Sequence, residues 1–468
     1  MKHIHLVAIC GVGMAPLAVM LKDSGYRVSG SDRQSYPPMG DVLKEAGISV
    51  TRGFAAANLE ARPDLVIVGN AVVRTNPEAM AVEELGIEKI SFPAALSRFY
   101  LGGKQCLVVA GTHGKTTTTG MLAHVLQTAG LDPGYLIGGL VRDFDRLARP
   151  AGGPYFVVEG DEYDSAYFDK RPKFIHYNPA AAIITSVEFD HADIYADLEA
   201  VKVAFAQLVS LLAVGAPLLG CGDWPDLREV VERGGSGVNF ISYGSNPDND
   251  WSIEDLRHDG ATMAFDCTFR GRREERLQLS LPGRMNALNA LAVYALGREL
   301  GVNRQALGAG LASYKGVARR QEVVGEVAGI TVVDDFAHHP TAVAATIAAV
   351  KDRWPGRPLR AVFEPRSNTS RRAIFQQRYG AALAAADRVV VSAVYAKEND
   401  PLADHERLCT ATLVAGLEAA AVPAWSADGP EAILERLLGE VESGEVVLVM
   451  SNGAFGGLAR RLVEALSG

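Results

Sequence analysis

The stretch that most constrains this chain is 108–119, where an apolar run leads into Gly111-Thr112-His113-Gly114 and then into Lys115 and four threonines. A strand that ends in a glycine-rich turn before a helix is typical of a phosphate-binding loop. Backbone N–H groups and the positive helix end bind phosphate oxygens, Lys115 adds a charge, and Thr116 offers a hydroxyl to Mg²⁺. The general pattern has Gly where Val109 stands, so this loop is a shortened variant. We predict that ATP contacts Gly111, Thr112, His113, Gly114, Lys115, Thr116 and Thr117.

Length and composition limit the kind of protein. At 468 residues the chain exceeds one ordinary core, and we expect three domains. Its 48% hydrophobic residues, 22% charged residues and 48 glycines fit an α/β protein. The net charge of −9 predicts small-molecule partners, with no nucleic acid and no membrane. Five scattered cysteines and the lack of a signal peptide or a long apolar run predict a cytoplasmic location.

The first hundred residues predict a doubly wound nucleotide-binding domain. A strand at 4–9 leads into a G-x-G turn, and a second strand ends at Asp32, where an acidic residue often meets a ribose. Pro16 replaces the third small residue of the dinucleotide motif, which weakens an NAD-dependent alternative. A strand at 64–68 ends in a polar loop that suits a uridine diphosphate, although Asn70 and Asn76 are also typical caps. The predicted UDP-sugar residues are Gly11, Val12, Gly13, Met14, Asp32, Asn70 and Ala71.

Carboxylates gather at the ends of two predicted central strands. The strand at 155–159 runs into E-G-D-E-Y-D, and the strand at 182–185 ends in E-F-D-H. Such a cluster is costly without a cation, so we predict Glu159 as a Mg²⁺ ligand and His191 as a ligand of a second cation. A solvated acidic loop and a structural histidine are the alternatives. On the helix that begins near 284, Asn286 and Asn289 share one face that suits an adenine edge, although Asn286 is also a possible cap.

These motifs together resemble the Mur ligase family of ATP-dependent amide-forming enzymes. The resemblance covers essentially the whole chain through G-T-H-G-K-T-T-T, E-G-D-E-Y-D, E-F-D-H, R-M-N-A-L-N and D-D-F-A-H-H-P. It implies an α/β fold of three domains: a Rossmann-like UDP-sugar domain at 1–102, a central P-loop ATPase-like domain at 103–315, and a Rossmann-like C-terminal domain at 316–468. ATP and Mg²⁺ are the implied cofactors.

Four further stretches, 35–39, 167–177, 363–369 and 450–457, are most similar to one branch of the family. That branch joins UDP-N-acetylmuramate to the murein tripeptide L-alanyl-γ-D-glutamyl-meso-diaminopimelate in peptidoglycan recycling. The alternative is the branch that adds L-alanine to UDP-N-acetylmuramate, which usually has His where Arg366 stands. Several family members carry a carbamylated lysine at the place that Phe205 occupies here, and Lys202 lies one turn away.

The resemblance also implies residue roles in acyl-phosphate chemistry. Lys115, Glu159 and His191 would be catalytic, and Thr116, Glu159 and His191 would hold cations. Arg319 or Arg320 would reach ATP phosphates, and Asp334 or Asp335 the ribose. A metal site made of adjacent pairs such as Asp334-Asp335 is disfavoured, because neighbours on a strand point to opposite faces. Peptide binding falls to Arg366, Ser367, Asn368, Ser451, Asn452 and Gly453, with solvated loops as the alternative.

Joining three substrates from three domains predicts that the third domain closes when ATP binds. A nucleotide-dependent regulatory protein without ligase turnover is the alternative from another functional class.

Overall fold

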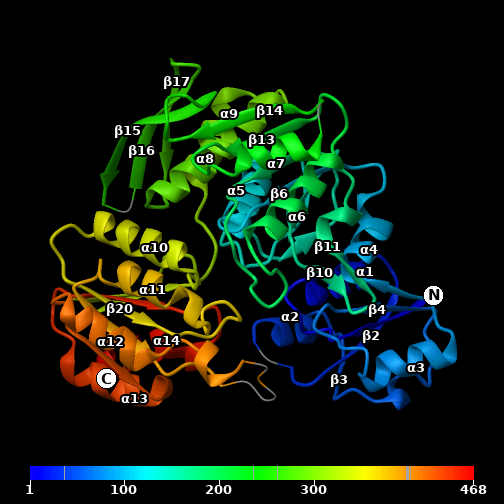
Figure 1. Ribbon diagram of the computed structural model, residues 1–468. Coiled ribbons are helices and arrows are strands. Elements are labelled where there is room, and N and C mark those ends of the chain that lie inside the picture. Colours follow the sequence, from blue (N-terminus) through cyan, green and yellow to red (C-terminus); the bar gives the residue numbers. More distant parts are fainter. Residues whose placement is uncertain (36, 236, 261, 397–399, 401) are drawn as a thin grey trace.

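The computed structural model describes residues 1–35, 37–235, 237–260, 262–396, 400 and 402–468. Tyr36, which belongs to the 35–39 stretch that distinguishes the family branch, lies outside the described residues. Three sheets with helices around them form three lobes, and the first and third lobes both lie against the central one (Figure 1). The three-domain α/β prediction is therefore confirmed, while the predicted domain boundaries at 102/103 and 315/316 stay predictions.

The first domain is a five-stranded parallel sheet in the order β3-β2-β1-β4-β5. This order matches the first five strands of the dinucleotide-binding order 3-2-1-4-5-6, in which ligands bind beyond the carboxyl ends of the strands. The loops after β1 and β4 therefore share one edge of the sheet. The elements are β1 (His3–Val7), α1 (Met14–Asp23), β2 (Arg27–Asp32), α2 (Met39–Glu45), β3 (Val50–Arg52), β4 (Leu65–Val68), α3 (Pro77–Leu85), β5 (Lys89–Ser91) and α4 (Phe92–Leu96).

The central domain has a ten-stranded sheet in the order β17-β16-β15-β14-β13-β12-β6-β9-β7-β8. Its strands from β7 to β15 are parallel, and β16 and β17 extend it as an antiparallel meander. The strands are β6 (Gln105–Ala110), β7 (Gly134–Leu136), β8 (Ala148–Arg149), β9 (Tyr155–Gly160), β12 (Pro179–Ile184), β13 (Pro217–Cys221), β14 (Asn239–Gly244), β15 (Trp251–Asp259), β16 (Thr262–Phe269) and β17 (Arg272–Leu279), beside a β10 (Asp164–Ala166) and β11 (Asp169–Pro172) hairpin. The helices are α5 (Lys115–Thr128), α6 (Leu198–Ser210), α7 (Leu227–Gly234), α8 (Arg284–Glu299) and α9 (Arg304–Ser313).

The third domain is a six-stranded sheet in the order β18-β19-β23-β20-β21-β22, antiparallel only at β18. Because β20 and β23 are neighbours, the loops after them lie side by side. The elements are β18 (Glu322–Val327), β19 (Ile330–Asp335), α10 (Pro340–Arg353), β20 (Leu359–Phe363), α11 (Gln376–Leu383), β21 (Arg388–Ser392), α12 (Thr410–Ala419), β22 (Ala424–Ala427), α13 (Gly429–Glu440), β23 (Val446–Met450) and α14 (Leu458–Ser467).

The two domain interfaces differ in chemistry. One hydrophobic cluster runs from the first domain into the central one and includes Leu17, Phe92 and Leu147. The third domain has clusters of its own and meets the central domain through polar contacts, such as the 2.8 Å ion pair between Arg142 and Glu322, and through an apolar one, in which Phe189 stacks on Phe375. Domains whose interface is not a large shared hydrophobic core commonly move relative to one another. Closure of the third domain on ATP stays a prediction.

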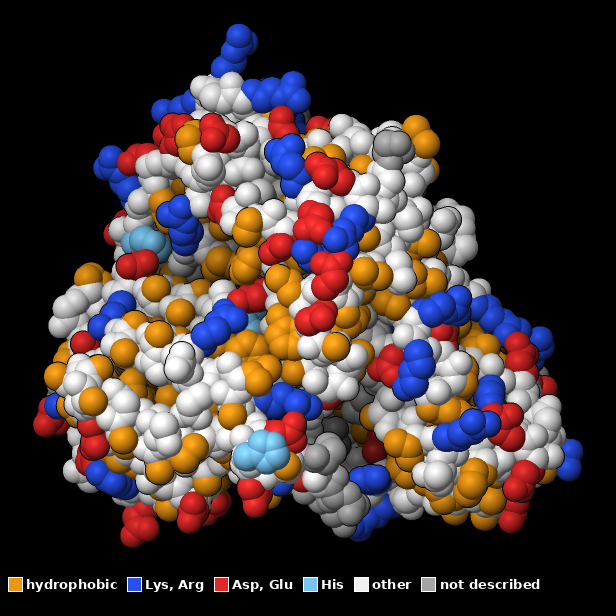
Figure 2. All heavy atoms as spheres, viewed as in Figure 1, with side chains coloured by type: hydrophobic (Ala, Val, Ile, Leu, Met, Phe, Trp, Pro, Cys, Tyr) orange, Lys and Arg blue, Asp and Glu red, His pale blue; other side chains and the backbone are white. Residues whose placement is uncertain are grey.

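Within the described ranges, no helix combines the length and the apolar character that crossing a membrane requires. On the face drawn in Figure 2, acidic and basic side chains are interspersed over all three lobes, and a recess separates the first and third lobes.

Candidate active site

The phosphate loop is held in a conformation that only glycine accepts easily. It connects β6 to α5, and Gly111 and Gly114 have φ values of 125° and 82°. A Cβ on Gly111 would lie 2.2 Å from Thr185 Oγ1, at the end of the neighbouring strand β12. The loop therefore combines left-handed backbone with a close approach to β12, and both features require the glycines that the sequence supplies.

Lys115 is the buried cation of the loop. Its Nζ donates to Gly111 O at 2.7 Å and lies 3.0 Å from Glu162 Oε2. Burial opposes the charge of Lys115, but Glu162 and Asp161 together hold its pKa above the ordinary value. Without nucleotide, Lys115 is thus a preformed positive charge whose partner is a carboxylate rather than a phosphate.

The four carboxylates of the E-G-D-E-Y-D segment differ in their partners. Glu162 pairs with Lys115, Asp161 with Lys173 at 2.8 Å, and Asp164 with Lys170 at 2.6 Å. Glu159 instead accepts from Thr116 Oγ1 at 3.1 Å and from Gly138 N at 2.6 Å, and no ion pair involves it within the described part of the chain. Burial and the nearby Asp161 raise the pKa of Glu159.

A partly buried carboxylate beside a threonine hydroxyl, with no ion pair in the described part of the chain, has the oxygen donors that Mg²⁺ prefers. Thr116 and Glu159 therefore fit the predicted cation site.

His191 comes to the same cluster from the loop after β12. Its backbone is left-handed, with φ of 52°, and its Nε2 lies 3.4 Å from Glu162 Oε1. Burial opposes protonation, but the hydrogen bond and charge of Glu162 raise the pKa of His191. The structure thus brings together the three residues predicted as catalytic, Lys115, Glu159 and His191, around one carboxylate cluster.

Two other residues of the phosphate loop contact the segment that follows β12. His113 N donates to Ser186 Oγ at 2.8 Å, and Thr112 Oγ1 donates to the Glu188 carbonyl at 3.0 Å. Thr117 is buried in the first turn of α5. The predicted ATP contacts of these three residues stay predictions, and their side chains already have structural roles.

The two asparagines of α8 have different contacts. Asn289 is buried against the loop, since a Cβ on Gly114 would lie 3.0 Å from its Oδ1. Asn286 Nδ2 donates to the Pro282 carbonyl at 2.7 Å, which is the local role that the sequence left open. Of the pair, Asn289 is the better placed for nucleotide.

The structure also separates the paired residues of the third domain. Arg319 Nε donates to Asp334 at 3.1 Å, whereas Asp335 is buried and accepts from the backbone of Gln321 and Ala337, both at 2.7 Å. Burial raises the pKa of Asp334 to about 6. Arg320 lies over the Phe336 ring, 4.8 Å from its centroid, and burial lowers its pKa. Asp334 is thus the member of its pair that remains available to a ribose, while Asp335 anchors the strand.

The predicted peptide residues form two groups. Arg366 stacks 3.8 Å from the Tyr395 ring centroid, lies 3.5 Å from Glu364 Oε1 and packs so closely on Gly453 that a Cβ there would lie 2.2 Å from Cδ. Ser451 donates to Glu364, and Asn452 Oδ1 is buried without a hydrogen-bond partner in the described structure. Ser367 instead closes a turn with Ser370, and Asn368 Nδ2 donates to Asp193 of the central domain at 2.5 Å. Arg366 and the 451–453 turn therefore lie in contact around Glu364, whereas Ser367 and Asn368 have other partners.

The first-domain residues gather at the predicted sheet edge. Asp32 accepts from Cys10 N at 2.8 Å and thereby supports the turn that carries Gly11, Val12, Gly13 and Met14. A Cβ on Gly13 would lie 2.9 Å from the Phe92 ring. Asn70 and Ala71 are exposed after β4, whereas Asn76 caps α3 through Glu78 N at 2.9 Å. Asn76 therefore has the structural role that the sequence left open.

The question of a modified lysine is answered by burial. Phe205 is fully buried in the core below α6. Lys202 pairs with Glu199 on α6, with Asp226 just before α7 and with Glu229 on α7. Lys202 is therefore occupied away from the phosphate loop and does not replace the missing residue.

Sequence reasoning missed two members of the site. Glu162 was counted in the acidic cluster but not as the partner of Lys115, and Glu188 was not assigned any role. Glu188 contacts His113 and Arg378, and although burial opposes ionisation, the hydrogen bonds from these side chains and the neighbouring histidines lower its pKa to about 2. Only the E-F-D-H spacing at a strand end could have signalled Glu188.

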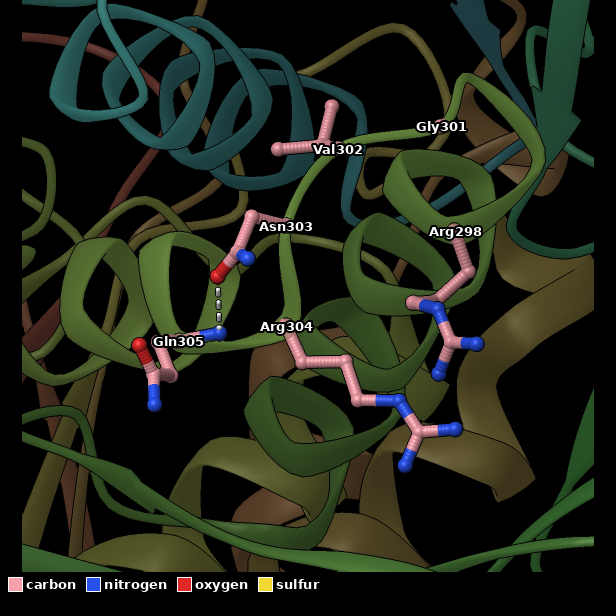
Figure 3. Close-up of a pocket in the computed structure, with 6 residues that line it drawn as sticks. All are labelled: Arg298, Gly301, Val302, Asn303, Arg304 and Gln305. Atoms are coloured by element: carbon pink, nitrogen blue, oxygen red, sulfur yellow. Dashed lines mark hydrogen bonds between the residues drawn. The ribbon is translucent and has the colours of Figure 1, made fainter.

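A surface hollow of about 590 Å³ lies elsewhere on the central domain, between α8 and α9 (Figure 3). Asn303 caps α9 there by accepting from Gln305 N at 2.9 Å. The hollow is at the carboxyl end of α8, about 18 Å along the helix from Asn289 by the rise per residue. It is not part of the phosphate site.

The fold and this geometry define a three-domain nucleotide-dependent enzyme built around a phosphate loop. Family models cover all three domains: "Mur ligase family, catalytic domain" matches residues 3–102, "Mur ligase middle domain" 109–297, and "Mur ligase, glutamate ligase domain" 319–453. The chain belongs to the Mur ligase family. It is an ATP-dependent ligase that forms a carbon–nitrogen bond.

Individual relatives cover the whole chain. It is 37% identical to the UDP-N-acetylmuramate–L-alanyl-γ-D-glutamyl-meso-2,6-diaminoheptanedioate ligase of Haemophilus influenzae, over 100% of this chain and 99% of that one. A solved murein peptide ligase from Psychrobacter arcticus has 32% identity and a TM-score of 0.75, over 100% and 99% of the two chains. The UDP-N-acetylmuramate–alanine ligase of Thermotoga maritima superposes with a TM-score of 0.81 at 25% identity, with 99% of both chains covered.

Proposed function

We propose that this chain joins the carboxylate of UDP-N-acetylmuramate to the amine of L-alanyl-γ-D-glutamyl-meso-diaminopimelate, in peptidoglycan recycling and in the cytoplasm. The observation that carries the proposal is the placement of Arg366 in the loop after β20. Its guanidinium lies beside Glu364 and stacks on the Tyr395 ring. A fixed guanidinium suits a peptide carboxylate, which free L-alanine offers at a different distance from its amine. The relatives named for the tripeptide reaction support the same choice.

The carboxylate of UDP-N-acetylmuramate does not react with an amine until it is activated. The muramate carboxylate attacks the γ-phosphorus of ATP, so ADP leaves and an acyl phosphate forms; the peptide amine then attacks the acyl carbon and phosphate leaves. Lys115 stabilises negative charge on the transferred phosphoryl group, and the loop amides orient it. Thr116, Glu159 and His191 would hold Mg²⁺, which neutralises phosphate charge when bound. We place the uridine diphosphate at Gly11–Met14, Asp32, Asn70 and Ala71.

The test compares two amines with the same enzyme. Purified protein is given ATP, Mg²⁺ and UDP-N-acetylmuramate with either the tripeptide or free L-alanine, and phosphate and the UDP product are measured. We expect the tripeptide to be joined with a kcat/KM that is higher by about 10- to 10²-fold, since one well-placed charged contact contributes roughly 1.5–3 kcal/mol. Faster turnover with L-alanine would assign the chain to the other branch of the family.

The Arg366→Ala variant tests the residue directly. We expect kcat/KM for the tripeptide to fall by about 10- to 10²-fold, because the carboxylate loses a charge-assisted partner. The KM for ATP should not change. Arg366→Lys should restore little of the lost kcat/KM, because a lysine ammonium cannot form the bidentate hydrogen bonds of a guanidinium or stack on an aromatic ring as it does.

A matched control is available in the same domain. Arg436 also stacks on an aromatic ring, 4.1 Å from the Trp425 centroid, and pairs with Glu440, but it lies on α13. Arg436→Ala should leave the tripeptide kcat/KM unchanged. Equal losses in the two variants would contradict a substrate contact at Arg366.

A further inference from the structure

Three side chains from two domains meet beside the phosphate loop, and only His113 has another predicted role, as an ATP contact. His113 comes from the loop, Glu188 from the segment after β12, and His339 from the start of α10 in the third domain. Glu188 Oε2 lies 2.7 Å from His113 Nε2 and 3.5 Å from His339 Nδ1. The three ligand atoms all lie within 4.8 Å of one another.

The hydrogen bonds of His339 fix where its proton is. Its Nε2 lies 3.2 Å from the Phe189 carbonyl, which can only accept, so Nε2 carries the proton. Nδ1 is then the nitrogen without a proton; it accepts the Thr341 N–H at 3.4 Å, as the cap of α10, and lies 3.5 Å from Glu188 Oε2. Burial, with His113 nearby, lowers the pKa of His339 to about 4, so the ring is neutral at pH 7. A metal ion at Nδ1 would therefore take the place of the long Thr341 N–H contact.

Glu188 is oriented by other donors. Its Oε1 accepts from Thr341 Oγ1 at 2.8 Å and from Arg378. These contacts hold the carboxylate so that Oε2 points at both imidazoles. The side chains of His113, Glu188 and His339 are only 10%, 13% and 1% exposed. A histidine that donates its outer N–H to a backbone carbonyl while its other nitrogen faces inward is the usual arrangement around a metal ion.

We propose that His113, Glu188 and His339 form a binding site for a divalent transition-metal ion of the Zn²⁺ type. Two imidazole nitrogens and one carboxylate oxygen suit Zn²⁺, whereas Mg²⁺ prefers oxygen ligands alone. Metal–ligand bonds of about 2.0–2.2 Å separate tetrahedral ligands by roughly 3.3 Å, so the observed spacings need only small adjustments. A bound ion joins the phosphate loop to α10 and so ties the third domain to the central one.

The experiment measures metal binding without turnover. Metal-free protein in excess Mg²⁺ is titrated with Zn²⁺ against a chromophoric chelator, and with Co²⁺ to record its visible absorption. We expect one equivalent of Zn²⁺ that is lost in His339→Gln and in Glu188→Gln. It should be kept in His124→Gln, whose histidine bonds only Ser313 Oγ on another part of the central domain, and in Glu159→Gln, which removes the nucleotide-side carboxylate.

Thermal unfolding is the second readout. A ligand that binds only the folded state raises the unfolding temperature, so Zn²⁺ should raise it for the wild type and His124→Gln but not for His339→Gln. If His339→Gln does not fold, His113→Gln and the wild-type titration decide. The proposal is overturned if the wild type binds no equivalent against the chelator, or if His339→Gln and Glu188→Gln still bind it.

Discussion

Replacing Lys115 with alanine should lower both phosphate release and amide formation by at least about 10³-fold. The change removes the positive charge that faces the transferred phosphoryl group, and single groups of this kind are worth about 10²- to 10³-fold or more. It also leaves Glu162 buried, with a side chain only 2% exposed, beside an empty volume. Removing one partner of a buried ion pair costs about 3–5 kcal/mol. Lys115→Ala should therefore also unfold at lower denaturant concentration.

A double variant separates the two effects. Lys115→Ala/Glu162→Gln removes the uncompensated carboxylate, so we expect most of the lost stability to return while activity stays low. Lys202→Ala is the matched control, because that lysine also pairs with carboxylates but lies on α6. Its activity should equal that of the wild type. Recovered activity in the double variant would show that the loss in Lys115→Ala came from the unpaired Glu162 carboxylate and not from the missing charge at the phosphoryl group.

Much of the fold follows from local signals in the sequence. The strands predicted at 64–68, 155–159 and 182–185 are apolar runs that lead into polar loops, and all three appear, as β4, β9 and β12. The antiparallel meander β15–β17 could not be recognised in the same way. Its strand β17, Arg272–Leu279, is mostly charged because one face is open to solvent, so it lacks the apolar run that marked the others.

The site shows the same division between local and long-range information. Gly111, Lys115 and Thr116 lie in one continuous motif, so spacing alone could assign them. The choice between Asp334 and Asp335 depends on which one meets the backbone of Gln321, and the spacing of two adjacent acids carries no such information. A role for Glu188 could not be predicted for a related reason. Its partners His339 and Arg378 belong to another domain and follow it by 151 and 190 residues.

Glu159→Gln should lower activity without lowering stability, whereas Lys115→Ala should lower both. Glu159 is partly buried among hydrogen-bond donors and no ion pair reaches it in the described structure, so burial raises its pKa. A neutral amide can keep the bond from Gly138 N without the cost of a buried charge. Without Mg²⁺, the variant should therefore be as stable as the wild type or more so. With Mg²⁺ and ATP, kcat should fall by about 10²- to 10³-fold, because the cation loses a charged ligand.

The Mg²⁺ dependence makes this prediction specific. The concentration of Mg²⁺ that gives half-maximal phosphate release should rise in Glu159→Gln, measured at saturating ATP. Asp164→Asn is the control from the same segment, since Asp164 pairs with Lys170, whose side chain is 70% exposed. Exposed pairs contribute about 0–1 kcal/mol, so this variant should keep both its stability and its Mg²⁺ requirement. An unchanged Mg²⁺ curve in Glu159→Gln would mean that another carboxylate holds the cation. Asp161 would then be the next to test, although Lys173 already neutralises it.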